Sequence, residues 1–267
     1  MRSLYKRVLV SFDGLCPYHC KHCYTLELSQ MSINRNMKDI VDSISDNDFD
    51  VVYVSQKNEN FYDPDQGILL CEGLFERYKC DVFMITRNIF SAQQQQRLRT
   101  LQMRMKERSN DLFLGVSIPA MTSWLITESD AVPHPQERIG FLKEMYNIGI
   151  PSLLIIRPLY PNNIIPISEL LCMIDSFKGN ISSVVSSGLI LNQKIISRLG
   201  LAWEDFRFLP TDNSEYLVGS GIDEKELKYV DVSSEIELLS EKCISSGIPF
   251  FRHTMPALSY IKSLPDL

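Results

Sequence analysis

Residues 6–23 read KRVLVSFDGLCPYHCKHC, and this stretch decides the fold. Its first part, Lys6–Phe12, is a short run of β-branched and aromatic residues that ends at Asp13-Gly14, which predicts a buried strand followed by a loop. The loop carries three cysteines in the spacing C-x3-C-x2-C: Cys16, Cys20 and Cys23. Three thiolates at these intervals can bind three different irons of one cubane cluster and leave the fourth iron open. An open iron can bind and reduce another molecule directly, whereas a fully ligated cluster only passes electrons outward.

Beyond this loop, strand-like and helical patterns alternate along the chain. Short β-branched or aromatic runs predict further strands at Asp50–Ser55, Asp81–Thr86, Asp111–Ile118, Ser152–Ile156 and within Ile181–Leu191. Apolar residues at helical spacing predict helices at Met37–Ile44, Gly67–Tyr78, Ser91 (as N-cap) to Glu107, Pro135–Asn147 and Ile167–Phe177. Strands and helices that alternate in this way form parallel βαβ units with right-handed crossovers. We therefore predict an α/β fold, a partial (β/α)6 TIM-type barrel.

The C-terminal part follows a looser pattern. Beyond Asn192 the sequence predicts short helices, a polar stretch at Thr211–Asp223, a helix near Ser234–Ser245 and a late strand at Pro249–His253. We expect residues 1–191 to form the barrel core. Residues 192–267 are expected to be an extension that packs on the barrel within the same domain and closes one side of it.

The composition limits the class of protein. Hydrophobic residues make up 45% and charged residues 22% of the 267 residues, which excludes a disordered or fibrous chain. The net charge of −6 argues against a generally basic surface for nucleic acid. The N-terminal apolar run is too short for a secretory signal, and no stretch is long enough to span a bilayer, so we expect a cytoplasmic protein without membrane contact.

The cysteine count favours metal or redox chemistry over disulfides. Seven is an odd number, and three of the cysteines fall within eight residues. The other four are scattered at Cys71, Cys80, Cys172 and Cys243. This is not the pattern of a disulfide framework.

The cysteine motif after a first strand resembles the signature of the radical S-adenosylmethionine (SAM) superfamily, whose fold is a partial (β/α)6 barrel. The resemblance implies a 4Fe-4S cluster on Cys16, Cys20 and Cys23, with SAM chelating the open iron. It also implies that reduction cleaves SAM to a 5′-deoxyadenosyl radical, which takes hydrogen from an organic substrate. A reducing partner such as flavodoxin or ferredoxin would supply the electron. The reaction class stays open, and the substrate is a small molecule, a peptide or a nucleic acid.

Three segments resemble the spore photoproduct lyase-like branch of this superfamily: Met84–Arg87, Val116–Ile118 and Glu128–Pro161. Named members of that branch repair a thymine dimer in DNA and keep a cysteine at the end of strand two. This sequence has Ser55 or Gln56 there. Because of the three similar segments, nucleic-acid repair or modification is an alternative within the enzyme hypothesis.

Polar residues at the carboxyl ends of the predicted strands are the candidate ligands, because active sites of βα barrels lie at this edge. The cofactor-binding candidates are His22, Ser55, Arg87, Ser117 and Arg157, and none of them is assigned a catalytic role. His22 stands where the family usually has an aromatic or apolar residue, and Ser55 stands where many members have a GGE stretch. Arg87, as a buried cation, needs an anionic partner. Arg157 is also a candidate for lining the substrate pocket, with Tyr160 and Asn162, and further strand-end candidates are Ser187 and His253.

Other interpretations remain open. His19 and His22 could join the cysteines in a zinc site, and the chain could be a non-catalytic metal-binding or regulatory protein. Arg97, Arg104 and Arg108 share one face of a predicted helix. That face is either solvated or a phosphate-binding surface, and helical charge runs are usually solvated.

Overall fold

The computed structural model describes residues 5–12, 16–27, 37–44, 49–55, 58–177, 179–209 and 227–264, and the structural statements below concern these residues. The polar stretch Thr211–Asp223 and the candidate Gln56 lie outside them.

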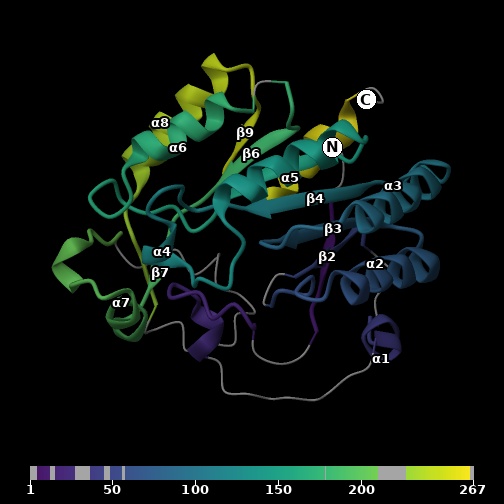
Figure 1. Ribbon diagram of the computed structural model, residues 1–267, viewed down its shortest axis with the longest axis horizontal. Helices are drawn as coiled ribbons and strands as arrows, with labels where there is room; N and C mark the ends of the chain where they lie inside the picture. Colours follow the sequence, from purple (N-terminus) through teal and green to yellow (C-terminus); the bar gives the residue numbers. More distant parts are fainter. Residues whose placement is uncertain are drawn as a thin grey trace.

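A seven-stranded parallel sheet forms the centre of the molecule, in the order β1-β2-β3-β4-β5-β6-β9 (Figure 1). Its strands are β1 Arg7–Val10, β2 Val51–Val54, β3 Asp81–Thr86, β4 Leu112–Ser117, β5 Ser152–Ile156, β6 Ser183–Ser186 and β9 Phe250–Phe251. The first five predicted strands are confirmed to within two residues at each end. β1 and β9 stand at opposite ends of the order and do not pair over the described residues, so the barrel is partial.

Helices connect the strands along the outer side of the sheet (Figure 1). They are α1 Met37–Asp42, α2 Pro64–Tyr78, α3 Ala92–Lys106, α5 Pro135–Asn147, α6 Ile167–Asp175 and α8 Ser233–Ser245. Ser91 begins α3 with a capping box to Gln94, and Pro135 occupies the first turn of α5, as the sequence predicts. Alternate strand residues such as Val52, Met84 and Leu154 point to this side and share one core cluster with the helices.

The inner side of the sheet is covered by a helix that the sequence did not predict, α9 Thr254–Ser263. Its apolar face, Ala257, Leu258 and Ile261, shares a second core cluster with the inward-facing strand residues. At its last turn, Lys262 Nζ lies 2.9 Å from Asp81 Oδ1 and 3.1 Å from Asp111 Oδ2, at the amino ends of β3 and β4. The C-terminal residues therefore fill the lower part of the barrel interior.

The short helix α4, Trp124–Thr127, lies between β4 and α5, and several further short elements lie between β6 and α8. The predicted segment Ile181–Leu191 contains β6 and, after a break, β7 Ile190–Leu191, which pairs antiparallel with β8 Lys228–Tyr229 in a separate small sheet. The short helix α7, Gln193–Leu199, begins at the capping residue Asn192. The late strand is confirmed, because β9 pairs parallel with β6. Over the described residues, no helix has the length and apolar character required to cross a membrane.

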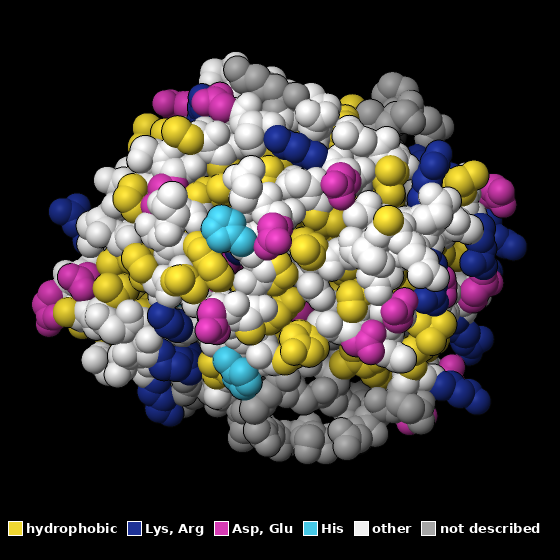
Figure 2. All heavy atoms as spheres, in the orientation of Figure 1, with side chains coloured by type: hydrophobic (Ala, Val, Ile, Leu, Met, Phe, Trp, Pro, Cys, Tyr) yellow, Lys and Arg dark blue, Asp and Glu magenta, His cyan; other side chains and the backbone are white. Residues whose placement is uncertain are grey.

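The arginine face of α3 pairs with acidic residues of α2. Arg97 Nη2 lies 2.6 Å from Glu72 Oε2, and Arg104 pairs with Glu76. Figure 2 shows basic and acidic side chains intermixed on the right-hand side, over these two helices. Partly exposed pairs of this kind agree with the solvated interpretation of the face.

We expect Gly115→Ala to lower the free energy of unfolding by about 1 to 3 kcal/mol, because the inner layer has no room for a methyl group. A Cβ at Gly115 would lie 2.9 Å from Phe83 Cζ and 3.0 Å from Ile155 Cγ1. The matched control is Gly140→Ala in α5, where a Cβ meets nothing within 4 Å. There the change is expected to stabilise the protein by about 0.5 to 1 kcal/mol. Urea denaturation measures both, and equal stability of Gly115→Ala and wild type would contradict the packing described.

Candidate metal and cofactor site

The cysteine loop lies at the carboxyl edge of the sheet and is held by the segment that follows β4. Lys21 N donates to Thr127 O over 2.9 Å, and Ser129 Oγ donates to Tyr18 O. Within the loop, Cys23 N donates to Cys20 O over 2.9 Å. A parallel sheet brings the segments that follow its strands to one edge, which places this segment beside the loop. The contacts reach the loop through its main chain.

A residue from the C-terminal half also holds this loop. Arg198 in α7 donates from Nε to Lys21 O over 3.1 Å and from Nη2 to Cys23 O over 2.7 Å. Nothing in the cysteine motif indicates this contact, since Arg198 lies 175 residues beyond Cys23.

The three thiols are enclosed to different degrees. Cys20 is 4% exposed and packs against Tyr18 and Val132, while Cys16 and Cys23 lie at the border of this small cluster. Burial raises the pKa of the Cys20 thiol to about 12, although the nearby positive charge of Arg87 lowers it. Burial also raises the pKa of Cys16. Since the thiolate is the metal ligand, metal binding here must release protons.

The cysteine arrangement differs from that of a single-ion site. In the described part of the chain, no three or more His, Cys, Asp or Glu side chains form a group that could hold a metal ion. A cubane does not require its thiolates to meet at one ion, because each thiolate binds a different iron. The donor set, three free cysteines on one loop beside a cation, therefore fits such a cluster.

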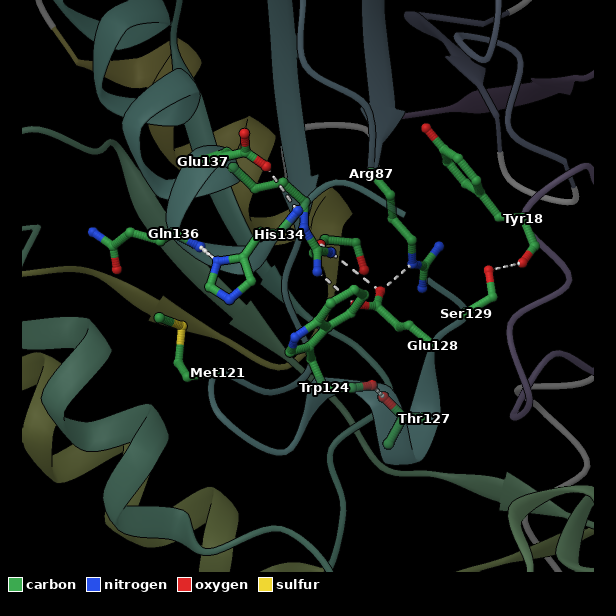
Figure 3. Close-up of polar contacts among 12 residues, drawn as sticks. Tyr18, Arg87, Met121, Trp124, Thr127, Glu128, Ser129, His134, Gln136 and Glu137 are labelled. Carbon is green, nitrogen blue, oxygen red and sulfur yellow. Dashed lines mark hydrogen bonds and ion pairs between the residues drawn. The ribbon is translucent and has the colours of Figure 1, made fainter. Parts of the chain in front are cut away.

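A buried carboxylate lies next to this loop, between two arginines. Glu128 and Arg138 are fully buried, and Arg138 Nη2 and Nη1 lie 2.5 Å and 3.1 Å from Glu128 Oε2 and Oε1. Arg87 Nε donates to Glu128 Oε1 over 2.8 Å, and Figure 3 shows the two side chains pointing toward each other. Arg138 Nη1 also donates to Ser117 O over 2.5 Å. Arg87, predicted to need an anion, thus has one.

A second acid holds the main chain at Arg87. Arg87 N donates to Glu59 Oε2 over 2.8 Å, and Thr86 Oγ1 donates to Glu59 Oε1 over 2.8 Å. Burial raises the pKa of Glu59, although these hydrogen bonds lower it. Through Glu59, the loop after β2 is fixed to the end of β3 beside the cysteines.

His22 connects the cysteine loop to Arg87. Its Nδ1 lies 3.0 Å from Thr127 O and its Nε2 lies 3.4 Å from Arg87 Nη2. Burial lowers the pKa of His22 to about 3, so the ring is neutral at neutral pH. Both contacts are satisfied when Nδ1 carries the proton and Nε2 accepts from Arg87. The ring also meets Tyr160 edge to face, with centroids 6.3 Å apart, and the buried Tyr160 hydroxyl has no partner among the described residues.

The other candidates lie in different surroundings. Ser55 has a positive φ of 76°, and its hydroxyl accepts from Asn60 N over 2.9 Å. Ser117 Oγ donates to Arg157 O over 3.2 Å. Arg157 Nη2 donates to Arg252 O over 2.7 Å. The structure thus brings His22 and Arg87 to the cysteines, while the hydrogen bonds of Ser117 and Arg157 join the ends of β4, β5 and β9 to one another.

Sequence reasoning missed the acids and the buried arginine, namely Glu59, Glu128 and Arg138. One signal was present: Arg138 lies on the apolar face of its helix beside Ile139, Phe141 and Leu142. A charge on a core-facing stripe requires a buried partner. For Glu59, which lies in a loop, the sequence offers no comparable signal.

One solved structure supports the fold. Methylornithine synthase (PylB) matches with a TM-score of 0.50 and 12% identity, over 97% of this chain and 86% of that chain. At this identity the likeness shows the fold alone. The pneumococcal exo-β-D-N-acetylglucosaminidase StrH matches with a TM-score of 0.27 and 11% identity, over 92% of this chain and 53% of that chain, which carries no argument. No protein-family model and no curated protein matches the chain.

We expect Glu128→Gln to lower the free energy of unfolding by roughly 3 to 5 kcal/mol, because it leaves Arg138 buried without a counter-charge. The control is Glu76→Gln, which removes a half-exposed carboxylate paired with Lys79 and should change stability little. Urea denaturation of the metal-free protein compares the two. A Glu128→Gln protein as stable as the control would show that the pair is not essential to the fold.

The raised pKa of Cys20 predicts slow alkylation by iodoacetamide at pH 8, because little thiolate is present. In the reduced, metal-free protein, the exposed Cys172 should react first. Arg87→Gln removes the charge that lowers the pKa of Cys20 and should slow its reaction further, whereas Arg99→Gln, at an exposed position of α3, should not. Peptide mass spectrometry follows each site, and labelling of Cys20 as fast as Cys172 would refute the prediction.

Proposed function

We propose that this chain is a radical SAM enzyme in which Cys16, Cys20 and Cys23 hold a 4Fe-4S cluster. The observation that carries the proposal is the position of the C-x3-C-x2-C loop, which lies at the carboxyl edge of a parallel, partial barrel with Arg87 beside Cys20. In βα barrels this edge is where ligands bind. The fold likeness to PylB agrees with the proposal.

The bound cluster would supply the electron that cleaves SAM to a 5′-deoxyadenosyl radical. The protein's own part is to hold three thiolates and to exclude water from them. The burial of Cys20 excludes water from its sulfur. Nearby positive charge makes this burial compatible with a thiolate. The positive charge of Arg87 lies close enough to Cys20 to lower the pKa of its thiol, although the acids Glu128 and Glu59 also lie near this guanidinium.

The role of His22 and Glu59 is to orient this charge. Glu59 fixes the main chain of Arg87, and neutral His22 accepts from its guanidinium, so the side chain has one direction relative to the loop. A preorganised cation costs no rearrangement when negative charge enters the site. The Tyr160 hydroxyl, buried beside His22, offers a further hydrogen-bond donor to a bound ligand.

The proposed reaction requires an electron donor and a substrate. A flavodoxin or ferredoxin would deliver the electron, and an organic molecule would lose the hydrogen atom. We place the reaction in the cytoplasm, where thiols stay reduced.

The test is anaerobic reconstitution of the full chain with iron and sulfide, followed by dithionite and SAM. We expect wild type to bind iron and sulfide and to release 5′-deoxyadenosine, measured by mass spectrometry. Serine at Cys16, Cys20 or Cys23 should abolish both, because each substitution leaves one iron without a ligand. Cys172→Ser is the matched control, since Cys172 is exposed and lies in α6.

The two readouts separate the parts of the proposal. Failure of wild type to assemble a cluster would refute the metal site. A cluster that forms but never yields 5′-deoxyadenosine would refute the SAM chemistry and favour a structural or sensing role.

A further inference from the structure

Two arginines and a histidine from three distant segments gather on the inner side of the barrel. Arg7 and Leu9 of β1 are exposed, and they alternate with Val8 and Val10, which pack in the outer core. Arg7 therefore faces inward, where its guanidinium carbon lies 5.3 Å from the ring centroid of Tyr53. Arg157 follows β5, and His253 follows β9.

Arg157 is a cation without a counter-charge. Its Nη2 donates to the main-chain oxygen of Arg252, and its Nε is buried without a hydrogen-bond partner. Within the described chain, no carboxylate lies at ion-pair distance from Arg157 or Arg7. Burial and the positive charge of Arg7 lower the pKa of Arg157 to about 10. A partly buried guanidinium without a counter-charge lowers stability.

His253 and the amino end of α9 lie near the same two arginines. Burial lowers the pKa of His253, and so do the charges of Arg157, Arg252 and Arg7. The amino end of α9 begins directly after His253, whose side chain does not cap it. Tyr53 joins this end to β2, because its hydroxyl donates to Thr254 Oγ1 over 3.0 Å. A helix amino end favours an anion.

We propose that Arg157, Arg7, His253 and the amino end of α9 bind an anionic oxygen group, a carboxylate or a phosphate, of the substrate. That the anion belongs to the substrate rests on the proposed function. The assignment to the substrate agrees with the positions of the two sites, because they have different neighbours. Arg157 lies near Tyr53, Arg7 and Arg252. The cysteine loop lies near Arg87, Thr127 and Arg198. The exposure of Arg7 and Leu9 gives this part of the inner side access to solvent.

The test uses the metal-free full chain with inorganic phosphate or succinate as probe, at an ionic strength held constant with sodium chloride. We expect either probe to raise the melting temperature of wild type saturably. Arg157→Gln should be folded and at least as stable as wild type without a probe, because it removes a partly buried cation that has no counter-charge. It should bind the probes about tenfold more weakly or worse. Arg7→Gln should show the same loss, and Arg99→Gln should behave as wild type.

A second experiment identifies the source of the anion. Equilibrium dialysis of SAM against the anaerobically reconstituted protein should give the same affinity for wild type and Arg157→Gln. A loss of SAM affinity equal to the loss of phosphate affinity would assign the site to the methionine carboxylate and overturn the substrate assignment.

The proposal is also overturned if neither probe stabilises wild type, or if Arg157→Gln responds as wild type does. The probe experiment needs no cluster, so its outcome is independent of the proposed function. A wild type that binds phosphate but makes no 5′-deoxyadenosine would leave the anion site standing and refute the enzyme.

Discussion

The carboxylate of Glu128 connects the parts of the chain on which the candidate site depends. Its oxygens accept from Arg87 at the end of β3 and from Arg138 in α5, and Arg138 also binds the main chain at the end of β4. The residues on either side of Glu128, Thr127 and Ser129, hydrogen-bond the cysteine loop. One buried ion-pair group therefore sets the distance between the loop and the strand ends. Such a group tolerates little change, because each lost partner leaves a charge without compensation.

The two sides of the sheet differ in what covers them. The outer side packs against the connecting helices in one large core, which stabilises the barrel. The inner side is apolar only in its lower part, where α9 covers it. Above this helix lie Arg157 and His253, and the cysteine loop lies at the same carboxyl edge. The helix thus closes the amino end of the barrel and leaves polar groups toward the other end.

Much of the fold was predictable, because strands such as Asp81–Thr86 are continuous β-branched and aromatic runs, and Ser91 and Pro135 are local start signals. The two-residue strands β7 and β8 are too short for any periodicity. Helix α9 was missed because its apolar face matters only once the inner side of the sheet exists. For the candidate site, the spacing predicted the cysteines and the strand-end position predicted Arg87, which the structure brings together. Glu128 and Arg198 were not predictable, since their partners are fixed only by tertiary contacts.

The way in which the cysteine loop is held bears on how this sequence can evolve. Thr127, Ser129 and Arg198 all reach the loop through main-chain atoms, of Tyr18, Lys21 and Cys23. Main-chain atoms are the same for nearly every amino acid, so these hydrogen bonds survive replacement of the side chains between the cysteines. Apart from His22, whose ring contacts Arg87, those positions can therefore change while the thiol spacing stays, and relatives of this chain should share the interval of the cysteines more than the residues between them.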